Sequence, residues 1–434
     1  MHRLLALWVN LRSSLWFLPS LIVMSAIALA LGLVEIGRMF PLLAQDKLPA
    51  AFGFSAQGSR AMLSAIASSM ITVAGVVFSI TIVALSLASQ QYSPRVLRHF
   101  MRDRGNQSVL GVFVGIFAYC LVVLPGIRGG EENGHVPAIA VAVGVALALV
   151  GVVYLIYFIH HVATSIQASS IVTTIAAETH HAISELFPHT LGEEAESEPR
   201  ELRSVTWHPI AASTSGELQI VNESALLKAA VAHDLLLKLD YCVGDFVLSG
   251  TPIASTNRPL DPKGDEATAI AASFTIDHTR TIEQDPAFGI RQIVDVALRA
   301  LSPAMNDTTT AILCLNVRTD LLRHAATRQA ESPFRVHDGK LRVVAKRATF
   351  ETFVQLSFDQ IRENGGRNVA LLQRILWALE AIAAVTRAPN RRHALARSAD
   401  ALADAAVCEL RDSEWRREMV ARARQLSLAC GRNA

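Results

Sequence analysis

The residues most able to do chemistry gather between Arg280 and Leu322. Asp285 precedes Pro286, and this pair predicts a helix that begins with an aspartate cap and a proline in its first turn. An Asn-Asp pair predicts the start of a second helix, whose free backbone N–H groups could hold an anion. The candidate anion pocket contains Arg280, Asp285, Arg291, Asp295, Arg299, Asn306 and Asp307.

The same residues also admit a purely structural interpretation. Arg291, Asp295 and Arg299 recur every fourth residue, so they form a stripe of alternating charge on one helix face. Helix caps and ion pairs of this kind are common in helix–turn–helix cores, where they fix the fold or a subunit contact. The sequence leaves both interpretations open.

No pattern typical of an enzyme accompanies these residues. The sequence holds no nucleophile–histidine pair, no phosphate-binding glycine run and no carboxylate–histidine metal spacing, and the adjacent Asp277 and His278 do not make a catalytic set. Neighbouring histidines at 160–161 and 180–181 do not share a helix face, which favours surface or interface positions over metal binding. We expect no catalytic residues, no metal and no cofactor.

The elements that carry these residues follow a long apolar region. Hydrophobic residues make up 51% of the 434-residue chain, and the mean hydropathy is +0.33, which is too apolar for an ordinary soluble protein. Each of four stretches can cross a bilayer as a helix. They are about Leu15–Gly37, Ala61–Ala88, Val109–Leu124 and Val136–Ile159.

Short loops set the expected orientation. Arg95, Arg98 and Arg102 follow the second span, whereas the loop after the third span is not basic, so the positive-inside rule places both termini in the cytoplasm. The three arginines would then lie at the cytoplasmic mouth of the spans. The net charge of +2 is too small to indicate a nucleic-acid partner.

The second span, read from Ala61 to Gln91, holds no charge and no proline. Steps of three and four residues along it define one narrow face at nearly heptad spacing, which we call the small-residue face. This face lines a pore between identical copies or packs tightly within the bundle of its own chain. Its members are Ser68, Thr72, Gly75, Ser79, Ile82, Ser86 and Ser89.

The expected fold class is an α-helical membrane domain of four transmembrane helices followed by a cytoplasmic α+β domain and a helical C-terminal region. The segment Gly244–Ser255 is typical of a small β-barrel-like hairpin, and a last helix is predicted over about Arg391–Leu428. The expected bounds are 1–160 for the spans, 161–190 for a helical stalk, 191–206 for an acidic linker, 207–345 for the α+β domain and 346–434 for the helical region.

Several segments together resemble a bacterial family of predicted membrane proteins of unknown function, DUF2254. They are AIASSMITVAGVVFSITIVALSLASQQYSPRVLRHFMRDRGNQ, GVFVGIFAYCLVVL, GDFVLSGTPIAS and RTIEQDPAFGIRQIVDVALRALSPAMNDTTTA. Asp307-Thr308 departs from the Asp-Pro that the family more often has. The resemblance implies a bacterial inner (cytoplasmic) membrane and supports the topology, but it implies no activity.

Two function hypotheses follow. The first is a homo-oligomeric, channel-like protein whose second span lines the pore and whose cytoplasmic domain regulates it. The second is a membrane-tethered sensor or scaffold whose cytoplasmic domain binds a small anion or a protein partner without conduction. The expected partners are the lipid bilayer, further copies of the chain and a small anion or ion, and an enzyme is the weakest of the alternatives.

Overall fold

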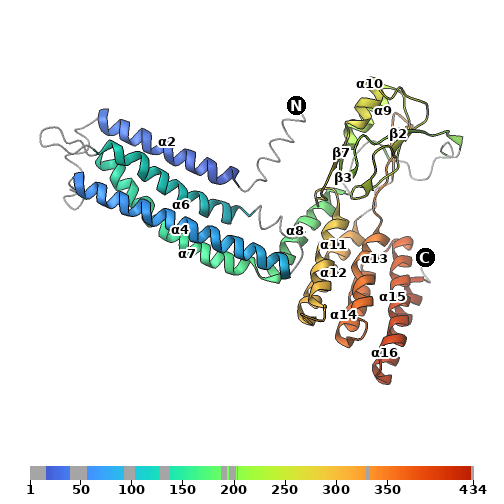
Figure 1. Cartoon of the computed structure of the whole chain (residues 1–434). Helices are drawn as coiled ribbons and strands as arrows, with labels where there is room; N and C mark the ends of the chain where they lie inside the picture. Colours follow the sequence, from blue (N-terminus) through green and yellow to red (C-terminus); the bar gives the residue numbers. More distant parts are fainter. Residues whose placement is uncertain are drawn as a thin grey trace. The chain divides into compact units, whose positions relative to one another are not determined.

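The computed structural model describes residues 16–39, 56–91, 103–127, 137–186, 193–194, 202, 204–328 and 333–431. The chain divides into two compact units, Met1–Ser170 and Ile171–Ala434. The first unit is built from helices, and the second combines helices with two small sheets (Figure 1).

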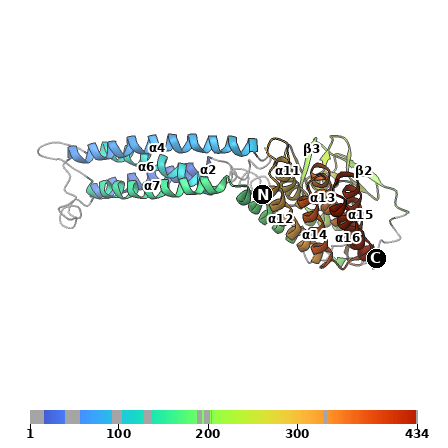
Figure 2. The ribbon, with the colours of Figure 1, turned by 90° about the horizontal axis from the view of Figure 1, so that it is seen from below.

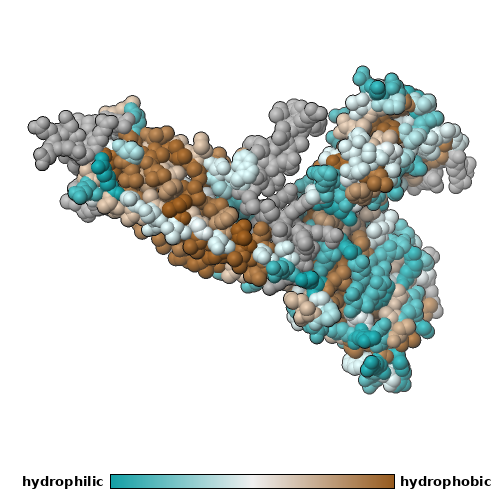
Figure 3. Space-filling view, viewed as in Figure 1, coloured by the Kyte–Doolittle hydropathy of each residue, from teal (hydrophilic) through white to brown (hydrophobic). Residues whose placement is uncertain are grey.

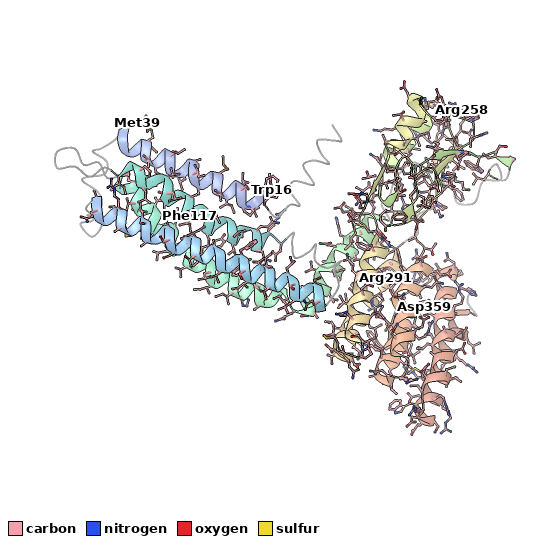
Figure 4. All side chains as sticks on the ribbon, in the orientation of Figure 1. Trp16, Met39, Phe117, Arg258, Arg291 and Asp359 are labelled. Atoms are coloured by element: carbon pink, nitrogen blue, oxygen red, sulfur yellow. The ribbon has the colours of Figure 1, made fainter. Side chains whose placement is uncertain are left out.

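Four helices of the first unit are long and apolar enough to cross a membrane, which confirms the four predicted spans. A short 3-10 turn, η2 (Leu124–Gly126), follows the third of them. The helices are α2 (Phe17–Met39), α4 (Ala56–Gln91), α6 (Arg104–Val123) and α7 (Ala138–Ser165). In Figure 4, Trp16 and Met39 mark the two ends of α2.

Helix α6 is the centre of this unit, because it packs against α2, α4 and α7 (Figure 2). A Cβ added to Gly111 of α6 would lie 2.8 Å from Cδ1 of Ile22 and 2.9 Å from Cα of Pro19 on α2. Small residues allow transmembrane helices to approach in this way. Tyr119 of α6 is fully buried, and its hydroxyl donates to the carbonyl of Ala140 at the start of α7 at 2.7 Å.

Apolar residues cover much of the face of the first unit that Figure 3 shows, where they are coloured brown. An apolar surface of this extent would be a liability in water, and a lipid environment removes the cost of exposing it. Its most exposed members include Met24, Leu149, Val153 and Ile156.

The sheets of the second unit are small. One has the order β1-β8-β9-β4-β6-β2, in which only β4 and β9 run parallel, and the other has the order β5-β3-β7. Helices α9 (Glu223–Ala232) and α10 (Asp265–Ala271) accompany them. The strands are β1 (Glu193–Glu194), β2 (His208–Ala211), β3 (Gly216–Val221), β4 (Leu237–Leu239), β5 (Phe246–Val247), β6 (Pro252–Thr256), β7 (Phe274–Asp277), β8 (Phe334–His337) and β9 (Lys340–Val344).

The barrel-like hairpin expected at Gly244–Ser255 is not confirmed. Strand β5 pairs with β3, whereas β6 pairs with β2 and β4, so the two strands lie in different sheets. Gly250 has a φ of +84°, and its N–H donates to the carbonyl of Ala212 at 2.9 Å. This bond and the one from the Ala212 N–H to the Thr251 carbonyl draw the chain toward β2.

Six helices of the second unit form three helical hairpins stacked in two rows. Helices α11, α13 and α15 contact one another in sequence, and α12, α14 and α16 form the other row (Figure 2). A further helix, α8 (Ala168–Leu186), leads into this unit. The six are α11 (Pro286–Ala300), α12 (Thr308–Thr327), α13 (Phe350–Gly365), α14 (Val369–Ala383), α15 (Pro389–Glu409) and α16 (Ser413–Gly431).

Two helices that were predicted to be unbroken are interrupted. The last helix, expected over about Arg391–Leu428, divides because Leu410 is extended (ψ 121°) and Asp412 caps a new helix by accepting the N–H of Glu414 at 2.8 Å. The fourth helix was also expected to run on into the cytoplasm as the stalk, but the turn at 166–167 separates α7 from α8. The predicted domain bounds stay predictions.

The Gly111 contact yields a prediction about the first unit. Gly111→Leu should lower the free energy of unfolding by about 2 kcal/mol, because the new side chain would overlap the backbone of Pro19, which cannot rotate away. Gly32→Leu is the matched control, since a Cβ at Gly32 meets nothing within 4 Å. Thermal unfolding of both variants in detergent measures the difference, and equal losses would refute the close packing.

Candidate functional site

The small-residue face of α4 points away from its own bundle. Ser68, Thr72, Gly75, Ser79, Ile82 and Ser86 are exposed, and Ser89 is partly buried. The opposite face of the same helix holds the residues that pack inside the unit, namely Leu63, Ala67, Met70, Ala74, Val77, Ala84 and Ala88. Within the described residues of the first unit, the helices α2, α4, α6 and α7 therefore do not use the small-residue face to pack against one another.

Contacts at single residues support this description. A Cβ added to Gly75 would meet nothing within 4 Å among the described residues, in contrast to Gly111 of α6. The hydroxyl of Thr72 donates to the carbonyl of Ser68 at 2.8 Å. A hydroxyl bonded to its own helix can lie in an apolar surrounding at little cost. The face is thus stable in lipid and also open to another helix or to water.

The arginines predicted at the mouth of the spans, Arg95, Arg98 and Arg102, lie outside the described residues, and their role stays a prediction. The structure instead describes a polar contact between the start of α6 and the end of α7. Asp103 caps α6 by accepting the Gly105 N–H at 2.7 Å, and its second oxygen lies 2.6 Å from Nε2 of His161.

The Asp103–His161 contact requires a glycine beside it. A Cβ at Gly105 would lie 2.5 Å from Nε2 of His161, so any other residue would displace the imidazole. The imidazole also stacks on Tyr157, with ring centroids 5.3 Å apart. His161 therefore has a structural partner on another helix, as the interface interpretation of the histidine pair predicted.

In the second unit, Asp285 caps α11 as predicted and binds Arg280. One carboxylate oxygen accepts the Phe288 N–H at 3.0 Å, and the other accepts from Nη2 and Nε of Arg280 at 2.6 and 2.9 Å. Asp285 is 3% exposed, and this burial raises the pKa of its carboxyl, which the Arg280 guanidinium opposes. Gly244, at a φ of +93°, leaves the space that both side chains occupy.

The remaining candidates lie further along α11 and at the start of α12. Arg291 and Asp295 form an ion pair at 3.2 Å. Asp307 caps α12 by accepting from the N–H and the hydroxyl of Thr310 at 3.0 and 2.6 Å, and these bonds lower the pKa of its carboxyl. Asn306 precedes it with a φ of +46°.

The structure does not gather these seven residues at one place. Helix α11 has 15 residues and is about 22 Å long, so Arg280 and Asp285 at its start are far from Arg299, Asn306 and Asp307 at its end. The charge of Asp307 already lies at the N-terminus that was expected to hold an anion. Anion binding by either group stays a prediction.

A cavity of about 420 Å³ in the second unit was missed by sequence reasoning. Its lining comes from the end of α8, the β3–α9 junction, the start of α11 and the segment after β9. Four carboxylates and two cationic side chains line it, and arginines pair with two of the carboxylates, so Glu185 and Glu283 are the ones left to face a ligand with a positive group. They are Glu185, Glu223, Glu283, Asp285, Lys346 and Arg347.

Most of the charged groups of this cavity already have partners, among them Asp285 with Arg280. Glu223 lies 2.5 Å from Nη2 of Arg347, and Lys346 donates to the carbonyl of Asp240 at 2.8 Å. Within the described ranges, no three histidines, cysteines or carboxylates lie close enough together to hold a metal ion.

Comparisons with known proteins show which family this chain is similar to. A family model described as "Predicted membrane protein (DUF2254)" matches residues 12–381. Uncharacterized proteins of Mycobacterium bovis and Mycobacterium tuberculosis are each 33% identical over 406 residues, which cover 91% of this chain and 76% of the relative. No solved structure matches the chain.

The carboxylate of Glu223, one of the paired groups of the cavity, yields a prediction. Arg335 of β8 is 2% exposed and lies 3.7 Å from Glu223. Glu223→Gln removes the negative charge beside this buried cation, and should therefore lower the free energy of unfolding by about 2–4 kcal/mol.

Glu351→Gln is the control, because the ion pair of Glu351 with Arg397 is exposed on both sides and should contribute less than about 1 kcal/mol. Chemical denaturation of the full chain in detergent measures both variants. Similar losses in the two would contradict a special role for Glu223.

Proposed function

We propose that this chain, which belongs to the DUF2254 family of predicted membrane proteins, forms a homo-oligomer in which α4 of each copy lines a shared passage across the bilayer. The observation that carries the proposal is the exposure of the small-residue face on a helix whose opposite face is packed. Tight packing within its own bundle, the competing explanation of this face, is not supported by that exposure.

The chemistry of the face suits a passage between copies. Small residues allow helices of neighbouring copies to approach closely, and rings of hydroxyls can replace part of the hydration shell of an ion. Ile82, the one large residue of the face, would form an apolar constriction that closes by dewetting. Because the face holds no acid or base, a proton-coupled pump is the poorer explanation.

Orientation and selectivity follow from the flanking charges. By the positive-inside rule both termini and the second unit lie in the cytoplasm, and the proposed location is a bacterial inner (cytoplasmic) membrane. Arg95, Arg98 and Arg102 at the cytoplasmic mouth would attract anions. The second unit would then act as the regulatory domain.

A cysteine scan tests the shared contact first. In a Cys408→Ser background, which removes an exposed native thiol, Thr72→Cys and Ser79→Cys should form disulfide-linked dimers under mild oxidation in membranes. Phe78→Cys is the control, because Phe78 is also exposed but lies about 100° around the helix from Ser79. Equal cross-linking at all three positions would contradict a specific contact through the small-residue face.

Conductance in planar bilayers tests the passage itself. Ser79→Trp should reduce the current of the reconstituted protein at least tenfold by filling the passage, whereas Phe78→Trp on the lipid side should leave it unchanged. Absence of current under salt gradients, voltage and membrane tension, or a current that Ser79→Trp does not alter, would refute the channel.

The second candidate function is a membrane-tethered sensor, and the cavity of the second unit is the observation that favours it. Its lining suits a small amine better than a small anion. Putrescine should raise the Tm of the full chain and inorganic phosphate should not, and Glu283→Gln should remove the effect of putrescine. Stabilisation by neither probe, or an effect of putrescine that survives Glu283→Gln, would count against a sensor of amines.

A further inference from the structure

The last turn of α8 is joined to the end of α12 by a compact set of polar contacts. The imidazoles of His180 and His324 stack with their centroids 3.8 Å apart. Nε2 of His324 lies 3.1 Å from the hydroxyl of Ser184 and accepts a hydrogen bond from Nε of Arg328 at 3.0 Å. Nη1 of Arg328 donates to the carbonyl of Ser184 at 3.1 Å.

This arrangement requires a neutral His324. The guanidinium of Arg328 is always charged and can only donate, so Nε2 of His324 must keep its lone pair. A proton on Nε2 would place two N–H donors and two positive charges against each other. The hydroxyl of Ser184 donates to the carbonyl of His180 at 2.9 Å, so it has no proton to offer Nε2 of His324 in place of the bond from Arg328.

We propose that the contact between the last turn of α8 and α12 is a pH-sensitive switch, closed while His324 is neutral and opened when His324 takes up a proton. The rest of α8 is held differently. Val172, Ile175 and Thr179 begin a buried stripe that Ala182 and Ile183 continue, and Thr179 packs against Gly289 of α11. The switch therefore breaks the polar contacts of residues 180–186 and leaves the buried stripe in place.

The charges around His324 also favour its neutral form. Burial, His180 and Arg328 lower the pKa of His324 below its ordinary 6.5, and only Asp320 opposes them. From α15, Arg391 brings a second guanidinium, which donates to the carbonyl of Arg328 at 2.7 Å. On α8 itself, Glu185 pairs with the outward-facing His181 at 3.2 Å.

The sign of the pH dependence follows from the lowered pKa. The open state has the higher pKa and binds the proton more tightly, so acidification favours opening. The contact is complete above about pH 6.5 and is lost as the pH falls through the lower pKa of the closed state. The inference does not rest on the proposed conduction.

Hydrogen–deuterium exchange of the full chain in detergent tests the switch. Between pH 8 and pH 5, protection factors corrected for intrinsic exchange should fall at least tenfold for amides 180–186 and less than twofold for amides 172–178. His324→Gln should abolish this fall, because the glutamine oxygen can accept from Arg328 but does not titrate. His181→Gln, which removes the exposed histidine of the same helix, should behave as the wild type.

A second variant keeps the test decisive if His324→Gln perturbs the fold. His180→Gln removes one of the groups that lower the pKa of His324 in the closed state, so acidification should open the contact less than in the wild type. The switch is overturned by an unchanged protection of residues 180–186 at pH 5, by the same fall in His324→Gln, or by a fall in His180→Gln at least as large as in the wild type.

Discussion

Close approach of helix backbones is the constraint on which the first unit depends. Lipid is as apolar as leucine, so transmembrane helices gain little by hiding apolar side chains from it, and their packing relies on contacts at short range. Helix α6 meets this constraint through Gly111, which contacts the backbone of α2. Gly75 of α4 offers the same opportunity and has no neighbour within the described part of the chain. The exposure of the whole small-residue face around Gly75 is the physical basis for proposing a second copy.

Features determined by local sequence were predictable. Asn222, Asp285 and Asp307 each cap a helix by accepting an N–H three residues ahead, so the signal and its effect lie within one turn. The four spans were predictable for a similar reason, since each depends on a run of apolar residues and on no other segment. The break at Leu410–Asp412 has a local signal too, in Asp412 before Ser413, but the surrounding amphipathic pattern concealed it.

Features assembled from distant segments were not predictable. The hairpin around Gly250 failed because its two strands find partners in different sheets. The cavity depends on α8, β3, α11 and the segment after β9, which no spacing rule connects. Asp103 and His161 are 58 residues apart, and Ser184 and His324 are 140 apart. Each histidine looked unremarkable beside its sequence neighbour, because the group that gives it a role comes from another helix.

The proposed switch must be small in energy and local in extent, because one titrating group supplies little free energy. One pKa unit of difference between two states corresponds to about 1.4 kcal/mol, whereas moving an equilibrium from 1:99 to 99:1 requires about 5.5 kcal/mol. A single histidine therefore cannot detach a helix that Val172, Ile175 and Ile183 hold by burial. It can release the hydrogen bond from Arg328 to the carbonyl of Ser184, because a hydrogen bond to a charged group contributes only about 1.5–3 kcal/mol. Restriction of the switch to the polar contacts of residues 180–186, with Ile183 still buried, is thus a requirement of the energetics.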